Sequence, residues 1–296
     1  MPISAGTDRR PNESGALRSL CSRLGGALIA VSVIAGTATA ARAESIEATF
    51  ARYAKGSAAA VDHGVWARLL TEHVKPGADG LNRVDYKAFK AKGHTDLKAY
   101  IGSLVVVDVA KLDRPEQFAF WSNLYNAKTI DIVLDKYPVT SIKDISLGGG
   151  ILASITGGPW KAKVVKVMGH DLSLDDIEHV ILRAIFKDPR VHYAVNCASV
   201  GCPNLMTTAF TGAMLEAQLE AGAKAYVNHP RGIRVEGGRV YASNIYDWFK
   251  ADFGGSADGV LKHVRVYADP ALKQKLEGLT RIYDYGYDWS LNDVAR

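Results

Sequence analysis

The stretch RPEQFAFWSNLYNAKTIDIVLDKY, residues 114–137, carries the strongest helical pattern in the chain. Pro115 stands near the first turn, where a missing N–H costs nothing, and Glu116 suits the positive end of a helix dipole. Pro138 ends the pattern, because proline cannot continue a helix. The charged residues of the second half share one face at about 100° per residue, and these are Lys128, Asp131 and Asp135. We therefore predict one long helix here.

Two asparagines of this stretch face the apolar side of the predicted helix. Asn123 projects between Ile130 and Leu134. Asn126 projects between Ile130 and Val133. A buried amide without partners costs roughly 1–3 kcal/mol, so both side chains need hydrogen bonds. Two interpretations remain open: each amide fixes a neighbouring loop, or each lies at the floor of a functional site.

The remaining chain divides into a helical first part and a mixed second part. Amphipathic helices are expected at residues 63–74 and 95–109. After residue 160 we expect strands at 161–167 and 190–196, helices at 173–186, 214–230 and 244–253, and a hairpin at 233–243. This order predicts an α+β fold, in which a helical N-terminal part is followed by a mixed, mainly antiparallel sheet with packed helices.

The first 43 residues predict an export signal rather than a part of the fold. A basic leader precedes the apolar run LGGALIAVSVIA, residues 24–35, which is shorter than the roughly 18 residues of a membrane span. Ala41 and Ala43 then flank Arg42 in the pattern that a signal peptidase cleaves. We expect residues 1–43 to be a secretory signal peptide. Residues 44–296 would then be one periplasmic or extracellular domain without a membrane anchor.

Composition supports a globular protein and gives no sign of a nucleic-acid partner. Of the 296 residues, 48% are hydrophobic and 23% are charged, which suits a substantial core. The formal net charge of +5 comes mostly from the arginines of the leader, and no basic cluster with interleaved aromatic residues follows. The glycine-rich stretch at 147–160 lacks the Gly-Lys-Ser/Thr ending of a phosphate-binding loop, so we expect a plain loop there.

Residues 196–203, NCASVGCP, hold the two cysteines that follow the leader, Cys197 and Cys202. Three chemistries fit them. Four intervening residues allow a disulfide, which an oxidising compartment preserves. A cysteine at the end of a strand, with a histidine near it, also suits a nucleophile. Together with His192, the two sulfurs finally offer three zinc ligands, although four intervening residues is the outer limit of the usual spacing.

Polar residues near this loop strengthen the prediction of a functional site. On the strand expected at 190–196 side chains alternate, so His192 and Asn196 share the face that leads into the cysteine loop. Glu178 lies inside the apolar stripe of the helix expected at 173–186, where a carboxylate must be paired or carry a raised pKa. His179 falls on the outer face of that helix and is expected to be solvated. Glu178 is therefore either part of a structural ion pair or a site residue.

Four motifs resemble an uncharacterised bacterial and plant family called domain of unknown function 547. They are FAFWSNLYNAKTI, LSLDDIEHVILR, VHYAVNCASVGCPNL and YDWSLN, and the resemblance runs from about Val65 to Asn292. It implies a single domain over that core and no stated activity. It also weakens a purely structural disulfide, because plant members are expected to work inside cells, where thiols stay reduced. The motif positions are Trp121, Asn123, Tyr125, Asn126, Glu178, His192, Asn196, Cys197, Cys202 and Pro203.

The leading hypothesis is an exported cysteine-dependent hydrolase or acyl transferase that acts on a peptide or cell-envelope amide. Cys197 would be the nucleophile and His192 the base. Glu178, Asn126 or Asn123 would orient the base, and the expected site-lining residues are Asn196, Cys202, Trp121 and Tyr125. The alternative is a non-catalytic envelope binding or scaffold protein with a Cys197–Cys202 disulfide. We expect no cofactor; zinc held by His192, Cys197 and Cys202 is the weaker alternative.

Overall fold

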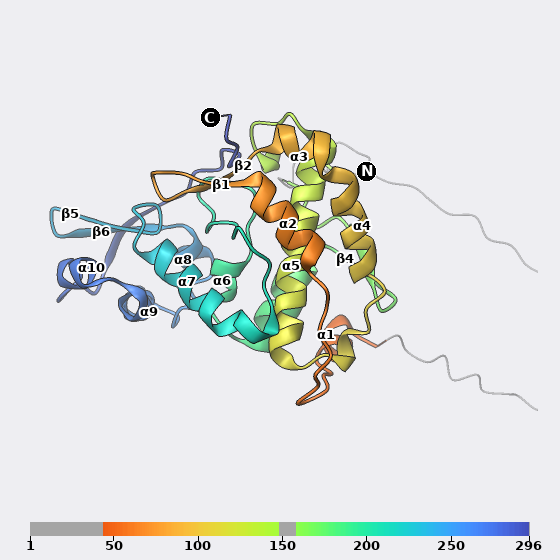
Figure 1. Ribbon diagram of the computed structural model, residues 1–296. Coiled ribbons are helices and arrows are strands. Elements are labelled where there is room, and N and C mark those ends of the chain that lie inside the picture. The colour runs from red at the N-terminus through yellow and green to blue at the C-terminus, as the bar shows by residue number, and fades with distance from the viewer. Residues whose placement is uncertain (1–43, 148–157, 296) are drawn as a thin grey trace, which may run out of the picture. The chain divides into compact units, whose positions relative to one another are not determined.

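The computed structural model describes residues 44–147 and 158–295, and Figure 1 shows their arrangement. These residues belong to one compact unit, Ala43–Arg296. The predicted signal peptide at residues 1–43 and most of the glycine-rich stretch lie outside the described residues, so both predictions stand as made. Within the described ranges, no helix is both long and apolar enough to cross a membrane.

The described part of the chain before residue 137 contains five α-helices. They are α1 (Ile46–Phe50), α2 (Gly64–His73), α3 (Tyr86–Lys92), α4 (His94–Leu104) and α5 (Arg114–Lys136). The predicted long helix is confirmed as α5, which begins where the Asp113 carboxylate accepts a hydrogen bond from the N–H of Arg114 at 2.8 Å. Nearly every residue of α5 from Glu116 to Leu134 is buried, and α3 and α4 pack along it (Figure 1).

The second part of the chain builds a smaller apolar cluster around a three-stranded sheet. The sheet contains β5 (Ile233–Glu236), β6 (Arg239–Ser243) and β7 (Ile282–Gly286) in that order, with β5 antiparallel and β7 parallel to β6. Gly237 and Gly238 form the predicted hairpin turn, and both have positive φ angles. Helices α7 (Leu215–Val227), α9 (Ala257–Tyr267) and α10 (Pro270–Lys275) complete this part (Figure 1).

Two short hairpins complete the strands, so the predicted α+β class is confirmed. Strand β1 (Val74–Pro76) pairs with β2 (Asn82–Val84), and β3 (Val165–Val167) pairs with β4 (His170–Leu172), both antiparallel. Short 3-10 turns lie at Val109–Lys111, Ile142–Asp144 and Gly212–Met214. The strand expected at 161–167 is shorter than predicted, since β3 spans only three residues.

Two predicted elements were wrong. Residues 190–196 form no strand but a single helical turn, α6 (Val191–Ala194), followed by an extended exit. All residues from Val191 to Asn196 are buried, so their alternation of side-chain types does not mark an exposed and a buried face. The helix expected at 244–253 is also shorter, since α8 spans only Ile245–Trp248. Short apolar segments of this kind do not distinguish helix from strand by pattern alone.

The helix expected at 173–186 is present, with a wider turn than expected. Ser173 and Asp176 form a capping box: Asp176 N donates to Ser173 Oγ at 3.1 Å, and Ser173 N donates to Asp176 Oδ2 at 2.7 Å. Residues Asp176–Phe186 then form η3, a π-helix with i→i+5 hydrogen bonds. A wider turn separates successive side chains by a smaller angle, which matters for Glu178 and His179.

Candidate functional site

The cysteine loop follows α6 directly and is closed by a disulfide between Cys197 and Cys202. Of the three chemistries left open for this loop, the structure shows the disulfide, and the two Cα atoms lie 6.1 Å apart, inside the roughly 4.4–6.8 Å that a disulfide needs. Cys197 is half-buried, whereas Cys202 is only 2% exposed. Ala198 between them has a φ angle of +60°, a left-handed conformation that non-glycine residues adopt rarely and that clusters at functional sites.

Hydroxyl and amide groups surround both sulfurs. The backbone N–H of Cys197 donates to the sulfur of Cys202 at 2.8 Å, and the Tyr287 hydroxyl donates to the same sulfur at 3.1 Å. The Ser199 hydroxyl lies 3.5 Å from Cys202 Sγ and 2.9 Å from the Tyr287 hydroxyl. Burial raises the pKa of Tyr287, so this phenol keeps its proton at neutral pH and remains a donor.

Two buried asparagines hold the loop on the structure. Asn126 Nδ2 donates to the carbonyl of Ala194 at 2.9 Å, and the N–H of Asn196 donates to Asn126 Oδ1 at 2.8 Å. The Asn196 side chain in turn donates to the carbonyl of Pro203 at 2.6 Å and accepts from the N–H of Ala198 at 2.8 Å. These bonds connect α5 to both ends of the cysteine loop, which favours the loop-fixing interpretation of Asn126.

Asn123 and Trp121 are buried on α5 but belong to other contacts. Asn123 Nδ2 donates to the carbonyl of Phe210 at 2.8 Å, and the N–H of Phe210 donates back to Asn123 Oδ1 at 3.0 Å. Trp121 packs edge-on against Phe50 and Phe120. The residues that line the cavity beside the disulfide include neither of them.

His192 lies between two carboxylates near the disulfide. Its Nε2 is 2.7 Å from Asp252 Oδ2, and its Nδ1 is 3.9 Å from Glu178 Oε1. Phe249 stacks on the imidazole with ring centroids 4.1 Å apart. The two nitrogens therefore face carboxylates rather than a sulfur. A zinc ion held by His192 and both sulfurs would require a broken bridge and a moved imidazole.

Glu178 faces the core as predicted, but its neighbour does not point away from it. Glu178 is 8% exposed and lies beside the buried hydroxyl of Tyr125, whose pKa is raised by burial and by this carboxylate. His179 Nδ1 is 3.9 Å from Glu178 Oε1, and both side chains line the same cavity. His179 is 37% exposed, as expected for the outer face, but the expectation that it stands apart from Glu178 was wrong. The wider turn of the π-helix reduces the angle between these successive side chains.

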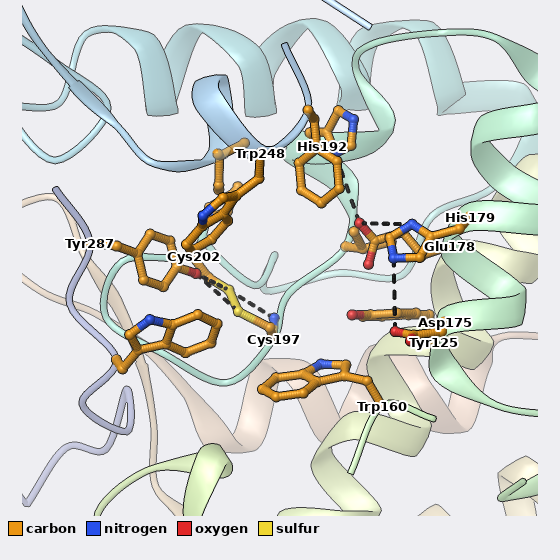
Figure 2. Close-up of a pocket in the computed structure, with 15 residues that line it drawn as sticks. Tyr125, Trp160, Asp175, Glu178, His179, His192, Cys197, Cys202, Trp248 and Tyr287 are labelled. Atoms are coloured by element: carbon orange, nitrogen blue, oxygen red, sulfur yellow. Dashed lines mark hydrogen bonds and ion pairs between the residues drawn. A yellow bond between two sulfur atoms is a disulfide. The ribbon is translucent and has the colours of Figure 1, made fainter. Parts of the chain in front are cut away.

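A cavity of about 160 Å³ joins these groups, and Figure 2 shows it. Tyr287 and Trp248 lie on one side of the disulfide, whereas Glu178, His179 and Asp175 lie across the cavity from it. Of the sequence-predicted site residues, five line this cavity: Tyr125, Glu178, His192, Cys197 and Cys202. Four do not, namely Asn123, Asn126, Asn196 and Trp121.

Sequence reasoning missed several residues of the site. Tyr287 and Trp289 lie in the quoted motif YDWSLN, and Ser199 lies inside NCASVGCP. The sequence therefore marked their segments but indicated no role for these three residues. Asp252 had no such signal, because it lies in the turn that follows α8 and reaches His192 only through the fold. Trp248 lies in the helix expected at 244–253 and carried no signal of its own, yet it lines the cavity and is 45% exposed.

We predict that Asp252 contributes to stability at neutral pH and loses this contribution in acid. The hydrogen bond from His192 and the bidentate contact with Arg183 hold the pKa of Asp252 well below its usual range. A lowered folded-state pKa gives stability that is present above the ordinary value of about 3.9 and is lost as the pH falls through the lowered value. Asp252→Asn should therefore be less stable by about 1–2 kcal/mol at neutral pH, and the deficit should shrink in acid.

Denaturant unfolding at a series of pH values measures this difference directly. Asp258→Asn is the matched control, because its carboxylate pairs with Lys262 on the surface and its loss should cost less than about 0.5 kcal/mol. A deficit of Asp252→Asn that stays constant down to about pH 2 would contradict the assignment.

Comparison with known proteins finds one family model that matches the segment around this site. Residues 109–227 match the family model described as "Protein of unknown function, DUF547". The resemblance inferred from the motifs is thereby confirmed over this segment, which contains α5, η3 and the cysteine loop. No curated protein and no solved structure matches the chain.

Proposed function

We propose that the Cys197–Cys202 bridge is a reactive disulfide that exchanges with the thiols of a substrate. One observation carries this proposal: the backbone N–H of Cys197 donates to the buried sulfur of Cys202, whereas Cys197 is the more exposed cysteine. The Ser199 and Tyr287 hydroxyls lie 3.0–3.5 Å from both sulfurs, so they can donate to whichever sulfur becomes a thiolate. A sulfur surrounded by donors is a good leaving group, because donors stabilise the thiolate that it becomes. A disulfide with a purely structural role has no need of such stabilisation.

The exchange step follows from this asymmetry. A substrate thiolate attacks Cys197 Sγ and forms a new sulfur–sulfur bond with it. The bond between Cys197 and Cys202 breaks, and its electron pair goes to Cys202 Sγ, next to the Cys197 N–H and the hydroxyls of Tyr287 and Ser199. A second substrate thiolate then releases Cys197 as a thiolate, so a dithiol is oxidised and the protein is reduced. Another disulfide compound restores the bridge.

The proposed setting is an oxidising compartment outside the cytoplasm. The signal-like pattern of residues 1–43 supports export, and a disulfide persists in such compartments. The substrate would be an exported peptide or envelope polypeptide that carries thiols. The cavity of about 160 Å³ is smaller than the roughly 300–1,000 Å³ of typical small-molecule sites, so it would receive one side chain rather than a large ligand.

A native exchange assay tests the proposal. We expect the folded protein to oxidise a dithiol peptide repeatedly in the presence of glutathione disulfide, and trapping with iodoacetamide after partial reduction should label Cys197 before Cys202. A bridge that resists excess dithiothreitol in the folded protein would contradict exchange. That result would favour the non-catalytic binding or scaffold protein instead.

A second candidate is the cysteine-dependent hydrolase or acyl transferase. The observation that favours it is that His192, Glu178 and Cys197 line one cavity. It requires a reduced Cys197 and a rotated His192, since the imidazole nitrogens now face Asp252 and Glu178. Transient acylation of Cys197 by an activated ester, in reduced protein and dependent on His192, would support this reaction.

A further inference from the structure

The cavity beside the disulfide has an aromatic wall, which we define as Trp160, Trp248, Tyr287 and Trp289. Successive ring centroids lie close together: Tyr287 to Trp289 is 4.7 Å, Trp248 to Tyr287 is 4.9 Å, and Trp160 to Trp289 is 5.7 Å. The Nζ atom of Lys143 already lies 5.1 Å from the ring centroid of Trp289. Such rings attract cations, because their faces carry negative charge density.

Two carboxylates stand across the cavity from Trp248 and Tyr287 of this wall (Figure 2), and Trp160 lies beside one of them, since the N–H of Asp175 donates to the Trp160 carbonyl at 3.0 Å. The side chains of Asp175 and Glu178 are 30% and 11% exposed. In the described part of the chain their ion-pair partners are only histidines: His179 lies 3.8 Å from Asp175, and Glu178 lies 3.9 Å from His179 and His192. By contrast, Asp252 is matched by Arg183 at 2.6 Å.

We propose that this cavity binds an ammonium group, so that the substrate presents a lysine-like side chain next to the thiol that attacks Cys197. The proposal deepens the proposed function, on which it rests, by naming the charge of the substrate. Aromatic faces on one side, and on the other side carboxylates whose ion-pair partners are histidines 3.8–3.9 Å away, stabilise a cation between them. The volume of about 160 Å³ admits the end of one side chain.

Matched probes test binding without any exchange chemistry. Choline carries a quaternary ammonium, and 3,3-dimethylbutan-1-ol has the same shape without the charge. Calorimetry and, as a second measurement, tryptophan fluorescence are made on the oxidised wild-type protein. We expect both to show that choline binds about tenfold more tightly than the neutral alcohol. Equal affinities, or no binding of choline at millimolar concentrations, would overturn the proposal.

Substitutions locate the probe. Asp175→Asn should weaken choline binding by about threefold or more, and Trp248→Leu by about fivefold or more. Asp171→Asn makes the same change, and Tyr283→Leu also removes an aromatic ring, at exposed positions outside the cavity, so both should leave the affinity unchanged. If both cavity substitutions leave the affinity for choline unchanged, the assignment of the binding site to this cavity is overturned.

The two proposals fail separately. Choline binding does not require a reactive disulfide, and reduction by the neutral reagent dithiothreitol does not require an ammonium site. Normal choline binding with an inert bridge would therefore reject exchange alone, whereas a reactive bridge without charge selectivity would reject the ammonium site alone.

Discussion

Cys202→Ser is expected to accumulate as a stable mixed disulfide when a peptide with one cysteine is supplied as its symmetrical disulfide. The Cys197 thiolate attacks one peptide sulfur, the other peptide leaves as a thiolate, and no second sulfur of the protein then displaces the bound peptide from Cys197, so the mixed disulfide persists. Cys197→Ser should form no mixed disulfide, and both variants should lose dithiol oxidation by at least about 100-fold. Intact-mass analysis under non-reducing conditions, followed by peptide mapping, identifies the trapped cysteine.

The reverse pattern would contradict the proposed roles. A mixed disulfide on Cys202 in Cys197→Ser, with none on Cys197 in Cys202→Ser, would make the buried sulfur the attacked one. Cys21 is present if the leader is retained, so Cys21→Ser serves as the control and should exchange like the wild type. Peptide mapping also separates any adduct on Cys21 from one on Cys197.

Tyr287→Phe is expected to slow exchange by about tenfold while keeping an aromatic ring in the cavity wall, since one hydrogen bond to the leaving thiolate is removed. The rate of bridge reduction by dithiothreitol in the folded protein measures this effect. Tyr283→Phe is the matched control, because this tyrosine is 59% exposed on β7 and lies outside the cavity. An unchanged rate in Tyr287→Phe would remove the phenol from the step.

The helical part of the fold could be predicted because its signals are local. Helix α5 has a capping residue at Asp113, a proline in its first turn and a proline after its end, so local sequence signals indicate both of its boundaries. The hairpin of β5 and β6 is equally local, because Gly237 and Gly238 permit the positive φ angles of a tight turn. The prediction of a strand at α6 was wrong because all of these residues are buried, so no exposed face distinguishes the helical from the strand period of hydrophobic residues.

The site could be predicted only where one segment contains both its position and its chemistry. The cysteine loop and the inward-facing Glu178 meet this condition. Asp252 does not, since its ion pair with Arg183 spans 69 residues along the chain, and Tyr287 reaches Cys202 across 85. Contacts of this kind depend on how helices and strands pack, and a sequence pattern records nothing of that packing.

Asn126→Ala is expected to lower the free energy of unfolding by about 2–4 kcal/mol, because it leaves two buried backbone groups without partners. These are the carbonyl of Ala194 and the N–H of Asn196, which flank the start of the cysteine loop. A loop released from α5 should also displace the hydrogen-bond donors around Cys202. The exchange rate should therefore fall by more than the decrease in the fraction of folded protein explains. Urea denaturation and exchange rates in native buffer measure the two effects.

Gln117→Ala distinguishes positioning of the cysteine loop from general destabilisation. Gln117 also lies fully buried on α5, and its amide donates to the carbonyls of Arg52 and Val109, each at 2.8 Å. Its loss should cost a similar 2–4 kcal/mol or so by the same reasoning, yet its contacts lie with the N-terminal segment and not with residues 194–203. We therefore expect folded Gln117→Ala to exchange at the wild-type rate. Equal slowing in both variants would show that Asn126 acts through stability alone, whereas slowing confined to Asn126→Ala would identify it as the residue that positions the cysteine loop.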